Sequence, residues 1–193
     1  QLGASGHEVE YYAGLGISLS AISAALLSPV WGSLADRYGR KPMMIRAATA
    51  MVFTMGGIAF VPNIFWLLLL RFLNGVFAGY VPNSTALIAS QAPKEKTGYA
   101  LGTLSTGVVA GNLMGPFIGG LIAEMFGIRN VFLLIGGFFL VAALMTFYLI
   151  REDFVPVTRQ EEVGYRELLR QLRYPRMLIN LFLTSFVIQF AAQ

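Results

Sequence analysis

Cysteine is absent from this sequence, histidine occurs once, and charged residues make up only 12% of its 193 positions. Without cysteine the chain can form neither a disulfide nor a thiolate metal site. His7 precedes the first apolar run, where a solvated loop residue is the expected role. Soluble domains carry about 25% charged residues. This sequence therefore lacks the polar shell that a soluble domain of the same length needs.

Several functional signatures are also missing from the sequence. It has no glycine-rich phosphate loop of the Walker type, so ATP hydrolysis by this chain is not expected. It has no nucleophile–base pair, metal-ligand cluster or cofactor motif, which disfavours a membrane enzyme and predicts that no cofactor or metal is needed. The first residues show no signal-peptide pattern.

The chain is instead rich in long apolar stretches, since 56% of its residues are hydrophobic. Five are long enough to cross a bilayer, which takes about 20 residues as a helix. They cover residues 12–35, 43–61, 65–89, 100–123 and 131–150, and a sixth runs from Met177 to Gln193. We predict an all-α integral membrane fold. Residues 1–150 form one bundle, 151–176 a loop, and 177–193 the start of a second bundle.

Lysine and arginine are unequally distributed between the two sides of the predicted membrane. Twelve of the 14 follow the first, third and fifth spans: Arg37, Arg40, Lys41, Arg46, Lys94, Lys96, Arg151, Arg159, Arg166, Arg170, Arg173 and Arg176. Only Arg129 lies in a connection on the other side. Because basic residues favour the cytoplasmic side, we predict that residues 1–11 are outside and that the 151–176 loop is cytoplasmic. The net charge of +4 then reflects orientation and not nucleic-acid binding.

The 151–176 loop and one internal similarity add detail to this architecture. Leucines and arginines between Tyr165 and Tyr174 predict a short amphipathic helix on the anionic inner leaflet. Residues 29–39 resemble residues 116–127, and the first segment ends inside whereas the second ends outside. Inverted three-helix repeats are typical of transporters. A chance likeness of two glycine-rich helices is the alternative.

The segment 32–41, Gly-Ser-Leu-Ala-Asp-Arg-Tyr-Gly-Arg-Lys, forms the turn between the first two spans. Its glycines permit a tight reversal, as they would in any positively charged loop. The full pattern, however, resembles the signature loop of the major facilitator superfamily almost position for position. The resemblance implies a charge cluster that opens and closes on the cytoplasmic side, with Asp36 as its acidic partner. The cluster consists of Gly32, Asp36, Arg37, Gly39, Arg40 and Lys41.

A second motif, residues 71–79, places an arginine inside the third span. An intramembrane charge costs on the order of a few kcal/mol, so Arg71 faces protein or water, or reaches back to the outer interface. The superfamily carries an arginine and a following glycine at this position. The resemblance implies that Arg71 assists proton movement by shifting the pKa of a nearby carboxylate.

The fourth span carries glycines at a spacing of four residues: Gly107, Gly111, Gly115 and Gly119. They form a ridge of small residues, which another helix can approach closely. Pro116 removes one backbone hydrogen bond, and Gly120 follows the ridge. A helix-packing face without any further role is one explanation of this spacing. The run 111–120 also resembles the antiporter motif of drug:proton exchangers in the superfamily, which favours export over uptake.

Polar residues inside the spans are candidates for a substrate cavity: Asn74, Asn83, Ser84 and Asn112. Hydrogen bonds between helices are an alternative role for each of them. The carboxylates Glu10 and Glu124 lie near the outer boundary and Asp36 near the inner one. We therefore expect the proton-titrating carboxylate in a part of the protein outside this chain.

Residues 81–89, 100–107 and 181–189 resemble segments of the PmrA/MdtG-type multidrug efflux pumps of bacteria, and the resemblance continues along the whole chain. It implies a stretch from the second helix to part of the seventh of twelve. We expect further helices before Gln1 and after Gln193, and a monomeric full-length protein in the plasma membrane. The predicted function is proton-driven export of lipophilic or cationic drugs by alternating access, with drugs, protons and membrane lipids as partners. A nutrient or metabolite symporter or uniporter is the alternative. A channel would need neither an inverted repeat nor a gating charge cluster.

Overall fold

The computed structural model describes residues 6–154, 180 and 184, with side chains from Tyr11 onward. The six helices with described bounds belong to one unit, Gln1–Pro156. They are α1 (Gly6–Tyr38), α2 (Arg40–Ile58), α3 (Ile64–Val76), α4 (Tyr80–Gln91), α5 (Thr97–Phe126) and α6 (Ile128–Leu149). No strand occurs among the described residues, so the all-α prediction is confirmed. The predicted loop helix at 165–174 lies outside the described residues, as does the span from Met177 apart from residues 180 and 184.

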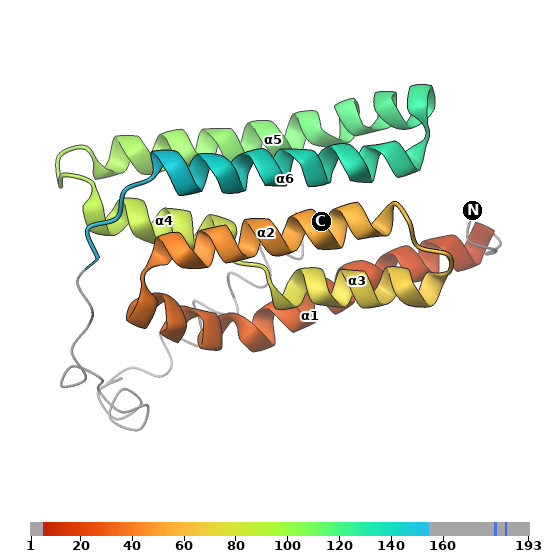
Figure 1. Cartoon of the computed structure of the whole chain (residues 1–193), viewed down its shortest axis with the longest axis horizontal. Coiled ribbons are helices and arrows are strands. Elements are labelled where there is room, and N and C mark those ends of the chain that lie inside the picture. The colour runs from red at the N-terminus through yellow and green to blue at the C-terminus, as the bar shows by residue number, and fades with distance from the viewer. Residues whose placement is uncertain (1–5, 155–179, 181–183, 185–193) are drawn as a thin grey trace. The chain divides into compact units, whose positions relative to one another are not determined.

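Successive spans cross the bundle in opposite directions (Figure 1). The end of α1, the start of α2, the end of α4, the start of α5 and the end of α6 lie at one end of the bundle, which we call the inner end (Figure 1). The positive charges predict that this end is cytoplasmic. The signature loop and the segment after α6 therefore meet at the same end.

Four segments of the described part are long and apolar enough to cross a membrane: Tyr11–Tyr38, Ile64–Gln91, Thr97–Phe126 and Ile128–Leu149. The second predicted span corresponds to α2, which begins at Arg40 and not at residue 43. Arg46 lies in the second turn of α2, although the charge count grouped it with the cations that follow the first span. Three cations in its first two turns make α2 less apolar than the other spans.

The third span is not the continuous helix predicted for residues 65–89. It consists of α3 and α4, separated by residues 77–79. Gly79 has a φ of 127°, which side chains other than hydrogen rarely allow, so the helix is interrupted there. We call residues 77–79 the break.

α2 is the centre of the bundle and packs against α1, α3, α4 and α6. Its buried residues are Met44, Ala47, Ala48, Thr54 and Ile58. Small residues bring α2 and α6 close, since a methyl group on Gly136 would lie 3.3 Å from the backbone nitrogen of Gly56. α5 packs on α6 and α4 and buries none of its residues.

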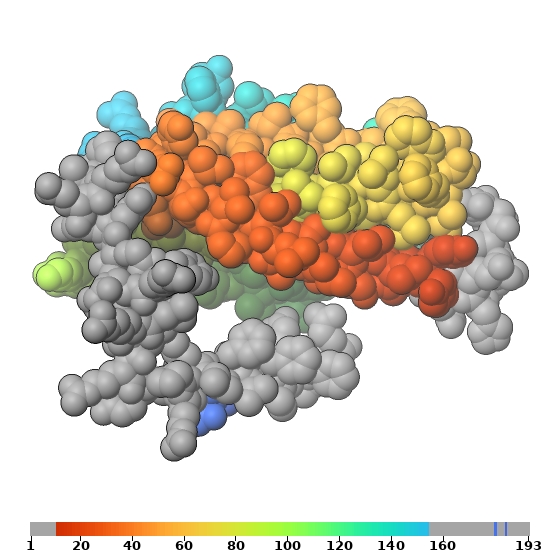
Figure 2. Space-filling view, turned by 90° about the horizontal axis from the view of Figure 1, so that it is seen from below, coloured from red at the N-terminus to blue at the C-terminus, as the bar shows by residue number. Residues whose placement is uncertain are grey.

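α1 and α3 approach even more closely, and Figure 2 shows them side by side. A methyl group on Gly75 would overlap the backbone oxygen and the hydroxyl of two α1 serines, Ser20 and Ser23. The Ser20 hydroxyl donates to the carbonyl of Arg71 at 2.6 Å, and the Ser23 hydroxyl donates to that of Phe72 at 3.0 Å. The glycine of the Arg71 motif thus permits the helix contact that these serines stabilise.

The structure repeats the helix–glycine–helix pattern noted in the sequence. α1 contains Pro29 and is followed by Gly39, and α5 contains Pro116 and is followed by Gly127. Both glycines have positive φ values, 96° and 85°, and the next helix follows each one directly. α1 ends at the inner end whereas α5 begins there (Figure 1). The two hairpins therefore have opposite orientations, as an inverted repeat requires.

Candidate functional site

The signature loop is a one-residue turn between two helices. α1 ends at Tyr38, Gly39 alone forms the turn, and α2 begins at Arg40. The Gly39 amide donates to the carbonyl of Ala35 at 2.9 Å. The next two amides, of Arg40 and Lys41, have no partner within α2, and Pro42 has no amide hydrogen. The first turn of α2 therefore needs two external acceptors.

Glu152, just after α6, supplies both acceptors. Its Oε1 accepts from the Arg40 amide at 2.7 Å, and its Oε2 accepts from the Lys41 amide at 2.8 Å. A helix start with basic residues is unfavourable, because the N-terminus carries a partial positive charge. The first turn of α2 has no acidic residue of its own. The carboxylate of Glu152 thus satisfies the amides and offsets the charge.

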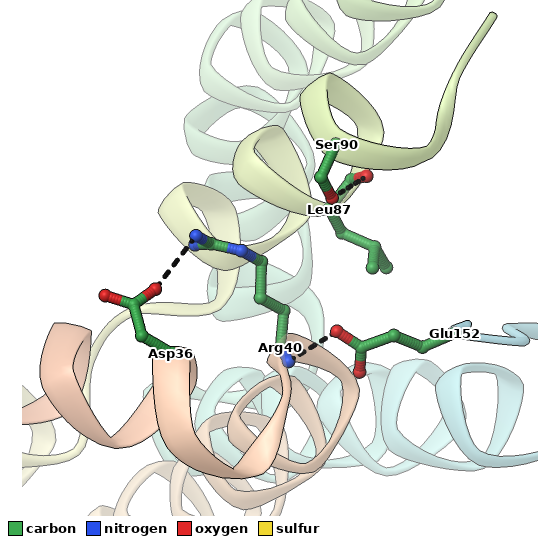
Figure 3. Close-up of polar contacts among 5 residues, drawn as sticks. All are labelled: Asp36, Arg40, Leu87, Ser90 and Glu152. Carbon is green, nitrogen blue, oxygen red and sulfur yellow. Dashed lines mark hydrogen bonds and ion pairs between the residues drawn. The ribbon is translucent and has the colours of Figure 1, made fainter. Parts of the chain in front are cut away.

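Asp36 provides the second ionic contact of the loop. Its Oδ1 lies 3.1 Å from Nη2 of Arg40, and the two side chains are 55% and 31% exposed. Figure 3 shows Arg40 with its guanidinium toward Asp36 and its backbone nitrogen toward Glu152. Lys41 lies over Phe147 of α6, with Nζ 5.8 Å from the ring centroid. The cluster therefore joins the α1–α2 turn to the end of α6.

The segment after α6 is also held by the end of α4. The side-chain amide of Gln91 can donate to the Arg151 carbonyl at 3.3 Å and accept from the Asp153 amide at 2.7 Å. We call residues 151–153 the strap. It contacts the start of α2 through Glu152 and the end of α4 through Gln91. In the described structure, it couples three spans at the inner end.

The other predicted loop residues occupy simpler positions. Gly32 lies on α1 with open space around it, and Arg37 lies in the last turn of α1. Gly39 is buried, and a methyl group there would lie 2.8 Å from Oε2 of Glu152. Glycine is therefore needed at position 39 for two reasons. It allows the positive φ, and it leaves room for the carboxylate of Glu152.

Arg71 lies on α3 and packs its side chain toward α1. A methyl group on Gly16 of α1 would lie 3.5 Å from Cγ of Arg71. Among residues 11–154, the structure gives its guanidinium no carboxylate within ion-pair distance. Its proton-coupling role stays a prediction.

The glycine ridge of α5 is open in the described structure. Methyl groups on Gly107, Gly111 or Gly115 would meet no atom within 4 Å, and one on Gly119 would meet only Val131 of α6, at 3.8 Å. Gly120 is likewise open, and Pro116 lies within α5 without ending it. No described helix covers the ridge at Gly107, Gly111 and Gly115.

The predicted cavity residues are mostly committed to contacts within the bundle. Asn74 donates to the hydroxyl of Thr54 on α2 at 3.2 Å. Asn83 donates to the Gly79 carbonyl at 2.8 Å, and Ser84 donates to the Tyr80 carbonyl at 2.9 Å. Asn112 is exposed on α5. The first three side chains stabilise helices here, and their role in a cavity stays a prediction.

Sequence reasoning missed Glu152, which contributes most contacts to the loop. Its position after a predicted span, 112 residues beyond Arg40, gave no sign of the pairing. One signal was present: the α2 start combines two cations with a proline and contains no acid, so an external carboxylate was needed.

Comparison with known proteins identifies this arrangement of helices and loop. A sequence profile of the Major Facilitator Superfamily matches residues 1–193. The chain belongs to the Major Facilitator Superfamily. Family membership and the four long apolar segments show a multi-pass protein of the bacterial plasma membrane.

Three relatives within the superfamily are informative. The chain is 68% identical over 192 residues to the multi-drug resistance efflux pump PmrA of Streptococcus pneumoniae serotype 4, covering 100% of this chain and 48% of that protein. It is 52% identical to the PmrA homolog of Lactococcus lactis, covering 100% and 47%. It is 45% identical to the multidrug resistance protein MdtG of Salmonella paratyphi A, covering 99% and 48%. The chain spans about half the length of the curated relatives it matches.

Proposed function

We propose that this chain forms about half of a multidrug efflux pump that exports lipophilic or cationic drugs in exchange for protons. The observation that carries the proposal is the charge cluster at the inner end, where Asp36, Arg40 and Glu152 join the α1–α2 turn to the end of α6. The names of the similar proteins, multidrug efflux and multidrug resistance proteins, support drugs as the substrate class.

The proposed mechanism is alternating access driven by the proton gradient, without a cofactor. Contacts at the inner end hold the helices together while the outer side opens, and their release opens the inner side. A charge cluster suits this role because its pairs are partly exposed and therefore contribute little to stability when closed. The cluster then adds only a small barrier to each conformational change.

Proton binding is assigned to residues outside the described spans. The carboxylates with described side chains are Asp36, Glu95, Glu124, Glu152 and Asp153, and all of them lie at helix ends or in connections. A carrier that alternately faces both sides needs a titrating group nearer the middle of the membrane. Arg71, inside α3, is the cation we propose to act on that group.

The test is efflux of a fluorescent cationic dye from cells that express a full-length protein containing this chain. The experiment compares cells with and without a protonophore, and includes an Asp36→Asn variant. We expect energy-dependent efflux that both the protonophore and the substitution abolish. If cells with correctly inserted protein retain as much dye as cells without the protein, drug export is overturned. A nutrient symporter or uniporter is then favoured.

A further inference from the structure

The break of the third span exposes backbone carbonyls inside the bundle. α3 ends at Val76, and within the break the amides of Phe77 and Ala78 bond back to Leu73 and Gly75 at 3.0 and 3.1 Å. The next three carbonyls, of residues 76–78, accept no backbone amide in the described part of the chain. In a membrane they must find another partner in the protein, because lipid tails offer no hydrogen bonds.

Two side chains from other helices supply these partners. Nε1 of Trp31, on α1, donates to the Val76 carbonyl at 2.6 Å. Nη2 of Arg46, on α2, lies 3.2 Å from the carbonyl oxygen of Ala78 and 3.4 Å from that of Phe77. Side chains of α1 and α2 therefore cap three consecutive carbonyls. The signature loop joins these two helices.

The positive charge of Arg46 is balanced by aromatic rings and by the C-terminal end of α3. Its Cζ lies 3.5 Å from the ring centroid of Trp31 and 6.0 Å from that of Phe77, within the range of cation–π contacts. The C-terminal end of α3 adds a partial negative charge. Within residues 11–154, the structure pairs Arg46 with no carboxylate. The guanidinium is thus bound to a helix end and an indole face, and the helix end changes position relative to Arg46 if α3 and α4 move.

The cap is incompletely satisfied. Nε and Nη1 of Arg46 are buried and have no hydrogen-bond acceptor in the described part of the chain. Buried donors without acceptors are rare in proteins, so these two require an explanation. Because two of its donors have no acceptor, the guanidinium of Arg46 can move to other acceptors at a small cost in free energy. Such a contact is suited to opening during a transport cycle.

We propose that Arg46 is a positioning residue that caps α3 at the break and so holds the angle between α3 and α4, and that this angle changes around Gly79 when the cap opens. The transport part of the proposal rests on the proposed efflux function. Hinges in proteins are a few loop or helix-terminal residues that absorb a large change of φ and ψ, and the break consists of such residues. Here the hinge is controlled by the helix that begins at the signature loop, which links the inner-end cluster to the centre of the third span.

A distance measurement tests the cap without requiring transport. Because this sequence has no cysteine, spin labels at Phe65→Cys on α3 and Ala89→Cys on α4 report the angle once any cysteines elsewhere in the full-length protein are replaced. We expect a narrow distance distribution in the parent and a broader or shifted one in Arg46→Gln, which loses charge and stacking. Phe53→Leu, on the exposed face of α2, is the control and should match the parent.

Two further variants separate the parts of the cap. Arg46→Lys keeps the charge but lacks the planar group that stacks on Trp31, so it should restore the distribution only in part. Trp31→Phe keeps a ring but loses the bond to Val76, and should broaden the distribution less than Arg46→Gln. A distribution in Arg46→Gln that superimposes on the parent's would overturn the proposal.

Transport kinetics test the hinge. The loss of one charge-assisted hydrogen bond corresponds to about a tenfold change in rate. We therefore expect Arg46→Gln to change turnover by about that factor and to leave the apparent drug affinity unchanged. Altered distances with unaltered turnover would show a structural cap and overturn the hinge. If the parent protein exports no drug, the proposed function fails, while the distance measurement still decides the cap.

Discussion

The carboxylate of Glu152 lies across the first turn of α2, with Oε1 2.7 Å from the backbone nitrogen of Arg40. The two residues are 112 positions apart, and they connect the end of α6 to the signature loop. A movement of α6 away from α2 must therefore break a charge-assisted contact or carry the loop with it. This coupling is the structural basis of the gating role that we propose for the inner end.

The first prediction concerns the charge of Glu152. Glu152→Gln keeps the size of the side chain but removes the negative charge from the α2 start, so the free energy of unfolding should fall by about 1 kcal/mol. Reversible unfolding of the purified full-length protein in detergent measures this change. Asp153→Asn, at the exposed neighbouring carboxylate, is the matched control and should have little effect. Equal effects of the two variants would show that the carboxylate of Glu152 does not cap the start of α2.

The second prediction is an energetic coupling between Gly39 and Glu152. Gly39→Ala introduces a methyl group 2.8 Å from Oε2 of Glu152 and strains a φ of 96°. In a Glu152→Ala background the collision disappears and only the backbone strain remains. The two substitutions should therefore be non-additive by about 0.5–3 kcal/mol in a double-mutant cycle. Additive effects would show that the carboxylate does not lie against Gly39.

The third prediction concerns the contact between α1 and α3. Gly75→Ala should destabilise the protein by about 1–3 kcal/mol, because the methyl group collides with the backbone of Ser20 and forces the helices apart. Thermal unfolding of the purified protein checks it. Gly137→Ala, at a helical glycine of α6 with open space around it, is the control. It should be neutral or stabilising, since alanine favours helices.

The fourth prediction separates gating from stability at Asp36. The pair with Arg40 is partly exposed, and such pairs contribute at most about 1 kcal/mol. Asp36→Asn should therefore leave membrane insertion and stability nearly unchanged and abolish transport. Glu124→Gln, at an exposed carboxylate near the far end of α5, controls for a general loss of charge. Retained transport in Asp36→Asn would remove Asp36 from the mechanism.

Local patterns in the sequence predicted the helices but not the contacts that organise them. The glycine turn at Gly39 and the inverted α5–α6 hairpin followed from spacing within short segments. The break at residues 77–79 did not, because residues 65–89 form one continuous stretch of membrane-spanning length and Gly79 is equally compatible with a packing glycine. Arg46 next to the loop was indistinguishable from a loop cation. Its role depends on Trp31 and on carbonyls more than 30 residues away, which only the fold brings together.

Transport driven by an imposed proton gradient tests the central claim most directly. A purified full-length protein containing this chain is reconstituted into proteoliposomes without ATP, and a pH jump is applied in the presence of a fluorescent cationic drug. The account predicts drug movement opposite to the proton flow, which stops when a protonophore collapses the gradient and is absent in Asp36→Asn. Drug movement in the same direction as the protons, or movement that the gradient does not affect, would contradict proton-coupled export.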